Sequence, residues 1–490
     1  MPKLTYRVLY NQDCTNLFAV TREPLEARHV EQMVDEVAGA GADVMLVNPN
    51  AQRVNYPSKV WQTFWDGFAP DSRAFFGPVP DADVPGRRHW VSQMKRLADQ
   101  GCDYLACALA RCRKRGIAPG VTIRMNDVHD VPWPGSNLFG RFYMAHPELR
   151  LSNPPICNWA GAGLNYEHPA VREHYLGLIG EIVTGYDLEV LELDFLRFPC
   201  YFPRSEFERH CEIMTDFIRE VRRLIDGSGK RIALIPRVAA VPAAARELGF
   251  DVGAWAGEGL VDGVTFGAFF TTAWTMPVDE YRRLVGDGVA LYASTDYAAD
   301  RRRHLPARNL PLDEQMLRGF AAGHLAAGAD GVCLFNFFCA REGPQPTDPL
   351  FAAIRDLGSL EGLRQKPRLH TVTGLASQPE ADGPVQTPVE LASGRVQEFR
   401  ILLAAGGSQV HVEVPFAGGP AEAEQLWMCL NAAPLGCAKQ IRPIPDAEQP
   451  AWAALFTAPH DAPVDGRNTI LLRNEGAAIT VLGLDVRVNP

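Results

Sequence analysis

The sequence predicts a (β/α)8 barrel followed by a small β-sandwich. Short apolar runs typical of buried strands alternate about eight times with helical patterns up to about residue 365. Polar and charged residues gather where these strands end, which in a (β/α)8 barrel is the catalytic face. Helical patterns then fade and short strands separated by turns follow. We therefore expect a barrel over 1–365, a linker over 366–384 and a β-sandwich over 385–490.

The individual elements follow from hydrophobic spacing. The barrel strands are expected at 7–10, 42–47, 120–125, 188–193, 231–235, 263–266, 289–293 and 331–335. The main helices are expected at 24–39, 88–115, 169–183, 205–225, 312–327 and 349–362. Pro236 is expected to end the fifth strand. The sandwich strands are expected at 396–403, 410–414, 425–430, 452–456, 469–472 and 479–488, with a hairpin connection at 465–468.

Composition excludes several classes of protein. The chain has 490 residues and a formal net charge of −10, which argues against a dedicated nucleic-acid or anionic-membrane surface. It contains no run of about 18 apolar residues and no apolar signal core near its start. The eleven cysteines are odd in number and scattered, as expected of reduced thiols in an intracellular protein. We expect a cytoplasmic protein in which homo-oligomers are possible.

The segment 187–199, Asp-Leu-Glu-Val-Leu-Glu-Leu-Asp-Phe-Leu-Arg-Phe-Pro, carries the strongest chemical signal. Glu192 and Asp194 lie two residues apart in an apolar strand, so both point to the same side. An isolated carboxylate is costly to bury, so the pair requires a reason. Asp194 either pairs with Arg197 or Arg237 to hold the barrel mouth, or acts as a nucleophile or proton donor. We interpret Glu192, one layer deeper, as a supporting residue.

Hydrolysis of a glycosidic bond needs a second carboxylate from another strand end. We prefer Asp296, because strand seven lies across the barrel from strand four. The alternative is that Asp296 only caps the next turn. Asp127 is the second choice, and Glu342 is the nearest acid after strand eight.

Further polar and aromatic residues at the strand ends and in the loops are candidates for substrate binding. Arg124, Asn126, Asp127 and His129 follow strand three together, and a group of this kind favours substrate contact. The complete set of substrate-binding candidates is Glu192, Arg197, Arg124, Asn126, Asp127, His129, Arg237, Tyr292, Tyr297, Asn336 and Trp159.

Several motifs are absent. The chain has no Gly-rich phosphate loop, no GxGxxG after the first strand, no HExxH pair and no GxSxG nucleophile elbow. We therefore expect neither a cofactor nor a catalytic metal.

The hexapeptide Asp194-Phe195-Leu196-Arg197-Phe198-Pro199 resembles the Asp-[Tyr/Phe]-x-Arg-[Phe/Tyr]-Pro signature of the glycoside-hydrolase-like barrel families, which are distantly similar to α-galactosidase and α-amylase barrels. The segments 168–172 and 329–332 support the resemblance, which covers most of residues 1–365. It implies a (β/α)8 fold, hydrolysis of a glycosidic bond and a nucleophilic role for Asp194. The acid/base residue of such relatives usually follows strand five or six, where this chain has no obvious acid.

We expect a glycoside hydrolase acting on an oligosaccharide or glycoside, with Asp194 as nucleophile and Asp296 as proton donor. Its partner is a carbohydrate substrate, with no nucleic acid and no membrane. Two alternatives remain open at this stage: a sugar lyase or isomerase that uses the same barrel mouth, and a non-catalytic glycan-binding protein.

Overall fold

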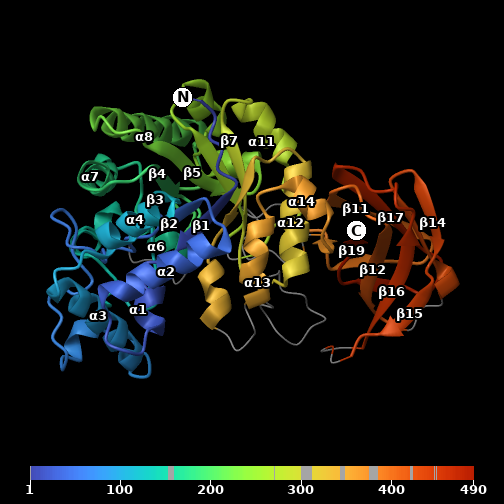
Figure 1. The fold of residues 1–490 in the computed structure, drawn as a ribbon, viewed down its shortest axis with the longest axis horizontal. Helices are drawn as coiled ribbons and strands as arrows, with labels where there is room; N and C mark the ends of the chain where they lie inside the picture. The colour runs from blue at the N-terminus through green and yellow to red at the C-terminus, as the bar shows by residue number, and fades with distance from the viewer. Residues whose placement is uncertain are drawn as a thin grey trace. The chain divides into compact units, whose positions relative to one another are not determined.

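A computed structural model of the chain shows a closed barrel of eight parallel strands, arranged in the order of the sequence (Figure 1). The structure describes residues 2–152, 159–269, 271–298, 312–342, 348–372, 374, 385–419, 423–445, 447 and 450–490. The barrel strands are β1 (Val8–Gln12), β2 (Val44–Val47), β3 (Ala118–Arg124), β4 (Val190–Asp194), β5 (Ala233–Ala239), β6 (Gly263–Gly267), β7 (Ala290–Thr295) and β8 (Gly331–Leu334). Every residue of these strands is buried, as expected of strands covered on both faces.

Helices follow or separate the strands, as predicted. They are α1 (Asn16–Val20), α2 (Ala27–Ala40), α3 (Val84–Asp99), α4 (Tyr104–Arg115), α5 (Arg141–Ala145), α6 (Trp159–Ala162), α7 (Pro169–Gly185), α8 (Phe207–Gly227), α9 (Pro242–Glu247), α10 (Val252–Gly257), α11 (Val278–Val285), α12 (Glu314–Ala326), α13 (Asp348–Ala353) and α14 (Leu360–Arg364). Short 3-10 turns lie at Ala74–Phe76, Pro147–Leu149, Phe337–Glu342, Ile354–Asp356 and Ala423–Gln425.

Several predicted elements differ from the structure, among them the strand expected over 479–488, which is divided into two strands, Ile479–Val481 and Asp485–Asn489. The helix expected over 88–115 is two helices, because Gly101 between α3 and α4 has a positive φ of 73°. The helix expected over 349–362 is likewise divided into α13, a 3-10 turn and α14. Strand β5 continues past Pro236, since residues on both sides of the proline still pair with β4. The expected hairpin connection at 465–468 instead contains the start of β17, which pairs with β11.

The residues group into two compact units. The first contains Met1–Thr265, Leu284–Ala290 and Phe335–Gly343; the second contains Phe266–Arg283, Leu291–Leu334 and Pro344–Pro490. Strands β1 to β5 and the loops that follow them therefore belong to the first unit. Helix α12 and the β-sandwich belong to the second.

The C-terminal β-sandwich consists of two antiparallel sheets. One contains β10 (Val389–Leu391), β18 (Ile479–Val481), β12 (Gln409–Ala417), β16 (Ala451–Ala458) and β15 (Gln440–Pro443), with β19 (Asp485–Asn489) paired to β12 and to β9 (Arg368–Thr371). The other contains β11 (Arg395–Leu403), β17 (Gly466–Asn474), β13 (Leu426–Leu430) and β14 (Ala433–Cys437). Alternating apolar residues such as Val412, Val414 and Leu472 form the core between the sheets. Strand β9 lies within the segment predicted as a linker.

Within the second unit, α12 packs closely against the sandwich. A Cβ added to Gly323 would come within 2.7 Å of the Leu402 carbonyl oxygen on β11. A Cβ added to Gly319 would overlap the Leu369 carbonyl oxygen on β9. Only glycine at these two positions lets the backbone of α12 come this close to the backbones of β9 and β11.

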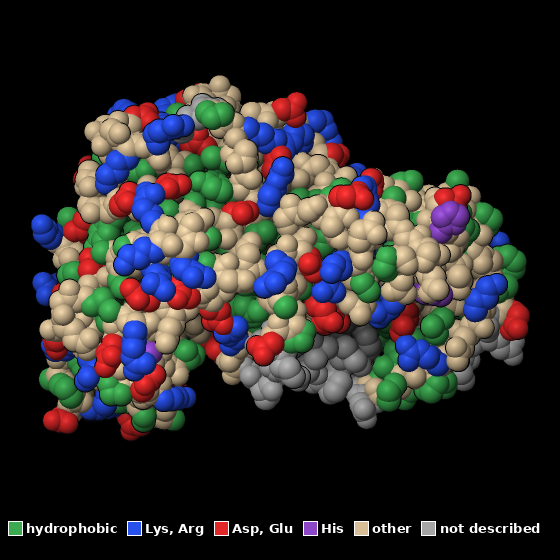
Figure 2. Space-filling model, in the orientation of Figure 1, with side chains coloured by type: hydrophobic (Ala, Val, Ile, Leu, Met, Phe, Trp, Pro, Cys, Tyr) green, Lys and Arg blue, Asp and Glu red, His purple; other side chains and the backbone are tan. Residues whose placement is uncertain are grey.

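Positive and negative side chains are interspersed over the face of the molecule in Figure 2, without a large area of one sign. Among the described residues, no helix combines the length and the apolar sequence needed to cross a bilayer.

Candidate active site

The carboxyl ends of β3, β4 and β5 place a cation, an anion and a second cation side by side. The register pairs Arg124 with Asp194, and Asp194 with Arg237. One layer deeper, Thr122 pairs with Glu192. Parallel strands in register bring side chains of one layer together, although the residues lie far apart in the sequence. All of these residues belong to the first unit.

Asp194 is held firmly through one of its two carboxylate oxygens. Oδ1 accepts hydrogen bonds from the backbone N–H groups of Leu196 and Arg197, both at 3.0 Å, and from Nη1 of Arg237 at 2.8 Å. The Arg237 guanidinium also lies over the Phe335 ring, 3.5 Å from its centroid. No described residue donates to Oδ2 of Asp194. Of the two expected roles of Asp194, the structure shows the pairing with Arg237, and Oδ2 accepts no hydrogen bond from a described residue.

Glu192 lies below Asp194 and is completely buried. Its Oε1 accepts from the Thr122 hydroxyl at 2.8 Å and from the Asn11 side-chain amide at 3.2 Å. Its Oε2 is buried without a hydrogen-bond partner among the described residues. Burial, and then the charge of Asp194, raise the pKa of Glu192 to about 7. A side chain without any exposed surface cannot contact a substrate, so Glu192 supports the site from below.

Asp127, His129 and Arg197 form a chain of hydrogen bonds at the mouth. Both oxygens of Asp127 lie within 2.9 Å of Nδ1 of His129, and Nη2 of Arg197 lies 2.9 Å from Nε2 of the same ring. A guanidinium can only donate, so Nε2 accepts and Nδ1 carries the hydrogen donated to Asp127. The His129 side chain is 33% exposed, so this chain reaches the open side of the site.

Burial and neighbouring charges shift the pKa values of Asp127 and Arg197, two residues of this hydrogen-bonded series. Burial opposes ionisation of Asp127, but His129, Arg124 and Arg197 hold its pKa well below the usual range. Asp127 therefore has no proton to give at neutral pH, and its geometry does not favour it as the acid. Burial and the neighbouring charge of Arg124 lower the pKa of Arg197 to about 10, which still leaves the guanidinium charged.

Arg124 lies between two carboxylates. One of its nitrogens pairs with Asp13, which follows β1, and another lies 3.4 Å from Asp127. Burial opposes ionisation of Asp13, but Arg124 and Thr15 hold the pKa of Asp13 well below its usual range. Asp13 is not among the site residues expected from the sequence. Its position directly after the first strand was the available signal.

Asn126 uses its side chain to join loops. Its amide nitrogen donates to the carbonyls of Leu164 and Cys200, at 2.9 and 2.5 Å, and its oxygen accepts from the Leu164 N–H at 2.9 Å. It is 1% exposed and has no donor left for a substrate. We therefore correct its expected substrate contact to a role in shaping the loops.

Phe198 and Asn336, which follow β4 and β8, have a backbone φ in the positive range. Phe198 in the hexapeptide has φ of 63°, and Asn336 after β8 has φ of 50°. Such values are uncommon outside glycine and are concentrated at functional sites. The Phe198 ring contacts the edge of His129 at a centroid distance of 4.9 Å.

Three of the remaining candidates belong to the second unit. Asp296 and Tyr292 belong to the second unit and are buried, whereas Tyr297 in the same unit is partly exposed. Oδ1 of Asp296 accepts from the Ala298 N–H at 3.3 Å, which is the turn-capping contact considered above. Trp159 begins α6, and its side chain lies outside the described residues.

Glu342, after β8, is a further acid of the first unit with an unusual environment. Burial raises the pKa of its carboxyl group, against the effect of the Asn16 side chain, which donates to it at 2.5 Å. The charge of Asp13 adds to the increase in pKa.

One group of side chains has the composition of a metal site. Glu167, Glu206 and His210 place their ligand atoms within 4.8 Å of one another. Nη1 of Arg209 already lies 3.1 Å from Glu167 and 2.6 Å from Glu206, so a side-chain cation occupies the space between the carboxylates.

No family model matches the chain, and no curated protein matches it. Solved structures resemble it at low identity. The PgaB (BpsB) glycoside hydrolase domain from Bordetella bronchiseptica is 12% identical, with a TM-score of 0.44, covering 73% of this chain and 99% of that one. The maltogenic α-amylase AmyB from Thermotoga neapolitana is 11% identical, with a TM-score of 0.41, covering 98% and 99%. The β-hexosaminidase of Streptomyces plicatus is 13% identical, with a TM-score of 0.39, covering 73% and 64%.

Proposed function

We propose that the protein is a glycoside hydrolase that cleaves an O-glycosidic bond, with Asp194 as its nucleophile. The observation that carries the proposal is the carboxylate at the end of β4, whose Oδ1 is fixed by three donors while Oδ2 has no partner among the described residues. A nucleophile held in one orientation loses little entropy when it attacks. The resemblance of the hexapeptide to glycoside-hydrolase-like barrels supports the same role.

In the proposed reaction, Oδ2 of Asp194 attacks the anomeric carbon while the bond from that carbon to the leaving oxygen breaks. A carboxylic acid protonates the leaving oxygen, and water then hydrolyses the ester between the sugar and Asp194. We assign the proton transfer to Asp296. Asp127 fits this role less well, because His129, Arg124 and Arg197 hold its pKa below the usual range.

Arg197 and His129 would orient the sugar. The Asp127–His129 hydrogen bonds hold the ring so that its Nε2 fixes the Arg197 guanidinium. Arg124 and Arg237, already paired with Asp13 and Asp194, would keep the charge of the mouth balanced.

Replacement of Asp194 tests the proposal. Wild-type protein is first screened on aryl glycosides and oligosaccharides. Asp194→Asn keeps the hydrogen-bond acceptor but removes the nucleophile, and should lower kcat by about 10²–10⁴-fold with the fold intact by circular dichroism. Asp187→Asn is the matched control, because Asp187 lies just before the same strand with its side chain 73% exposed. Near-full activity of Asp194→Asn would refute the assignment.

The products separate hydrolysis from its alternatives. Reaction in ¹⁸O-labelled water should place one labelled oxygen on the released sugar. An unsaturated sugar product without the label would instead assign a lyase.

A further inference from the structure

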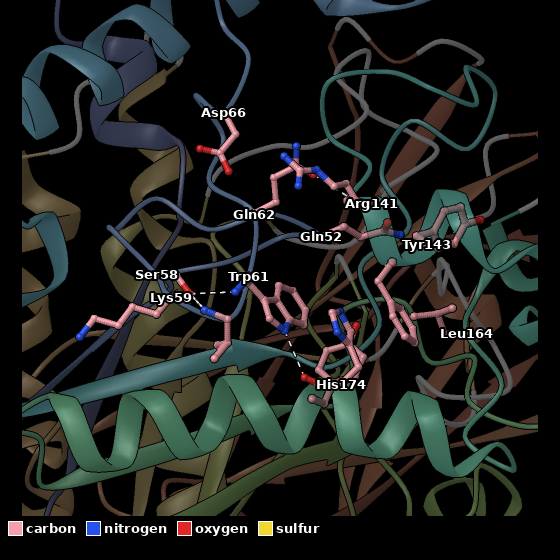
Figure 3. Close-up of a pocket in the computed structure, with 14 residues that line it drawn as sticks. Gln52, Ser58, Lys59, Trp61, Gln62, Asp66, Arg141, Tyr143, Leu164 and His174 are labelled. Carbon is pink, nitrogen blue, oxygen red and sulfur yellow. Dashed lines mark hydrogen bonds between the residues drawn. The ribbon is translucent and has the colours of Figure 1, made fainter.

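A cleft of about 470 Å³ lies among the loops after β2 and β3 and the side of α7, all in the first unit (Figure 3). Clefts of roughly 300–1,000 Å³ are the usual size of small-molecule sites. The proposed chemistry at Asp194 makes no use of this cleft.

Three aromatic rings form a stack along one wall. The His174 ring lies between Trp61 and Phe142, at centroid distances of 4.3 and 4.0 Å and interplanar angles of 10° and 7°. Nε1 of Trp61 donates to the backbone carbonyl of His174 at 3.1 Å, a bond drawn in Figure 3. The stack is therefore held rigidly against α7.

The stack leaves only the edge of the His174 ring open. No described residue forms a hydrogen bond with its nitrogens, although the ring lines the cleft. Burial and the neighbouring His146 lower the pKa of His174 to about 4, so the imidazole is neutral at pH 7. A neutral imidazole offers one donor and one acceptor.

Two glutamine side chains add neutral polar groups. Oε1 of Gln52 is buried and receives no hydrogen bond from a described residue. Oε1 of Gln62 accepts from the Arg141 N–H at 3.1 Å, which leaves its amide donors available to a ligand. The charged side chains of Lys59 and Arg141 are exposed, and Asp66 is used to bind the hydroxyl and N–H of Thr63.

These groups fit an uncharged polyhydroxyl ligand better than an anion. The buried or partly buried side chains that still have polar atoms for a ligand, Gln52, Gln62 and His174, are all neutral. Sugar hydroxyls can both donate and accept, and the apolar face of a sugar ring packs against aromatic side chains. An anionic ligand would find its cations only on exposed side chains.

Hydrogen bonds also connect the cleft to the candidate active site. Nε2 of Gln52 donates to the Asp127 carbonyl at 2.7 Å, and Leu164 in the cleft wall is held by Asn126. We propose that this cleft is a carbohydrate-binding subsite that takes a neutral sugar unit of the oligosaccharide cleaved at Asp194. The subsite rests on the proposed hydrolase function and extends it to substrates longer than a simple glycoside.

Binding is measured in the full-length Asp194→Asn protein, so that bound sugar is not consumed. Maltohexaose, cellohexaose and chitohexaose are each titrated by calorimetry. His174→Phe keeps the ring stack and removes both nitrogens, and Gln62→Leu removes the amide. His146→Phe is the control, because that ring also contacts Phe142, at 5.0 Å, but does not line the cleft.

We expect at least one oligosaccharide to bind, with affinity about 10-fold weaker in His174→Phe and in Gln62→Leu but unchanged in His146→Phe. The subsite is overturned if none of the three binds, or if both cleft variants bind as tightly as the parent. If wild-type protein cleaves aryl glycosides but no oligosaccharide binds, the proposed subsite is refuted and the proposed hydrolase function is not. If the cleft variants lose oligosaccharide binding but wild-type protein cleaves no glycoside, the cleft is a carbohydrate site and the proposed hydrolase function is refuted.

Discussion

At the scale of single residues, the site is a set of buried charges that balance one another. Arg124, Arg197 and Arg237 lie among the carboxylates of Asp13, Asp127 and Asp194. Buried ions are tolerated only when they are paired and hydrogen-bonded. Glu192 is the additional carboxyl group of the cluster, and its burial together with the charge of Asp194 raises its pKa, which favours the neutral form.

The raised pKa of Glu192 predicts a pH-dependent stability. The pKa rises from an ordinary 4.5 to about 7 on folding, so between these values the folded protein binds a proton that the unfolded chain has lost. This contribution is therefore fully present below about pH 4.5 and lost as the pH rises through about 7, a difference of about 3 kcal/mol. Glu192→Gln should lose less stability than wild type between pH 4.5 and 8 in urea unfolding. Glu189→Gln, at a partly exposed carboxylate just before β4, is the control. Parallel plots of unfolding free energy against pH for Glu192→Gln and wild type would contradict the prediction.

The Asp194–Arg237 pair predicts a strong coupling. Arg237→Met alone leaves a buried carboxylate without its cation and should reduce stability by about 3–5 kcal/mol. Adding Asp194→Asn should restore part of this loss, because the uncompensated charge disappears. A double-mutant cycle in denaturant measures the coupling, expected to exceed about 1 kcal/mol. Additive effects would show that the two side chains do not depend on each other.

At the scale of elements, backbone contact decides where side chains are allowed. Gly319 and Gly323 lie one turn apart on α12 and face the carbonyls of β9 and β11. Helix propensity alone would favour alanine at both positions by about 1 kcal/mol. The close approach of the strands reverses this preference.

Gly319→Ala should therefore lower the thermal midpoint markedly, since the added Cβ overlaps backbone that cannot rotate away. Gly177→Ala in α7 is the matched control, because a Cβ there meets nothing within 4 Å. The control should gain up to about 1 kcal/mol of stability. Equal gains in both variants, measured by calorimetry, would contradict the packing of α12 on β9.

At the scale of the whole molecule, the sandwich completes the second unit rather than forming an independent module. Strand β9 pairs with β19 near the C-terminus, and Arg368 at the start of β9 donates to the carbonyls of Arg364 and Ala404. These contacts join the end of the barrel sequence to the sandwich within one unit.

Removing residues 385–490 should therefore yield an aggregated protein or one with a much lower thermal midpoint. The deletion uncovers α12 at Gly323, which faces β11, and leaves β9 without its strand partner β19. Solubility and thermal unfolding of the shortened chain measure this. A soluble monomer with the midpoint of the full chain would show that the barrel is independent of the sandwich.

The sequence by itself determined the order of strands and helices and the position of Asp194, because apolar spacing and strand ends are local patterns. Its errors were also local. Gly101 divides a helical pattern, and Pro236 does not end a strand whose other residues still pair. The sequence also indicated that Glu192 and Asp194 point to the same side of the strand, since alternation in a strand requires only the chain itself.

Only the tertiary structure decided which charges meet. Arg237 is 43 residues from Asp194, and Asp13 is 111 residues from Arg124. The register of parallel strands sets these pairs, and register depends on how the whole barrel closes rather than on spacing within any segment. For the same reason the sequence left both roles of Asp194 open, and the structure shows that Asp194 pairs with Arg237 through Oδ1.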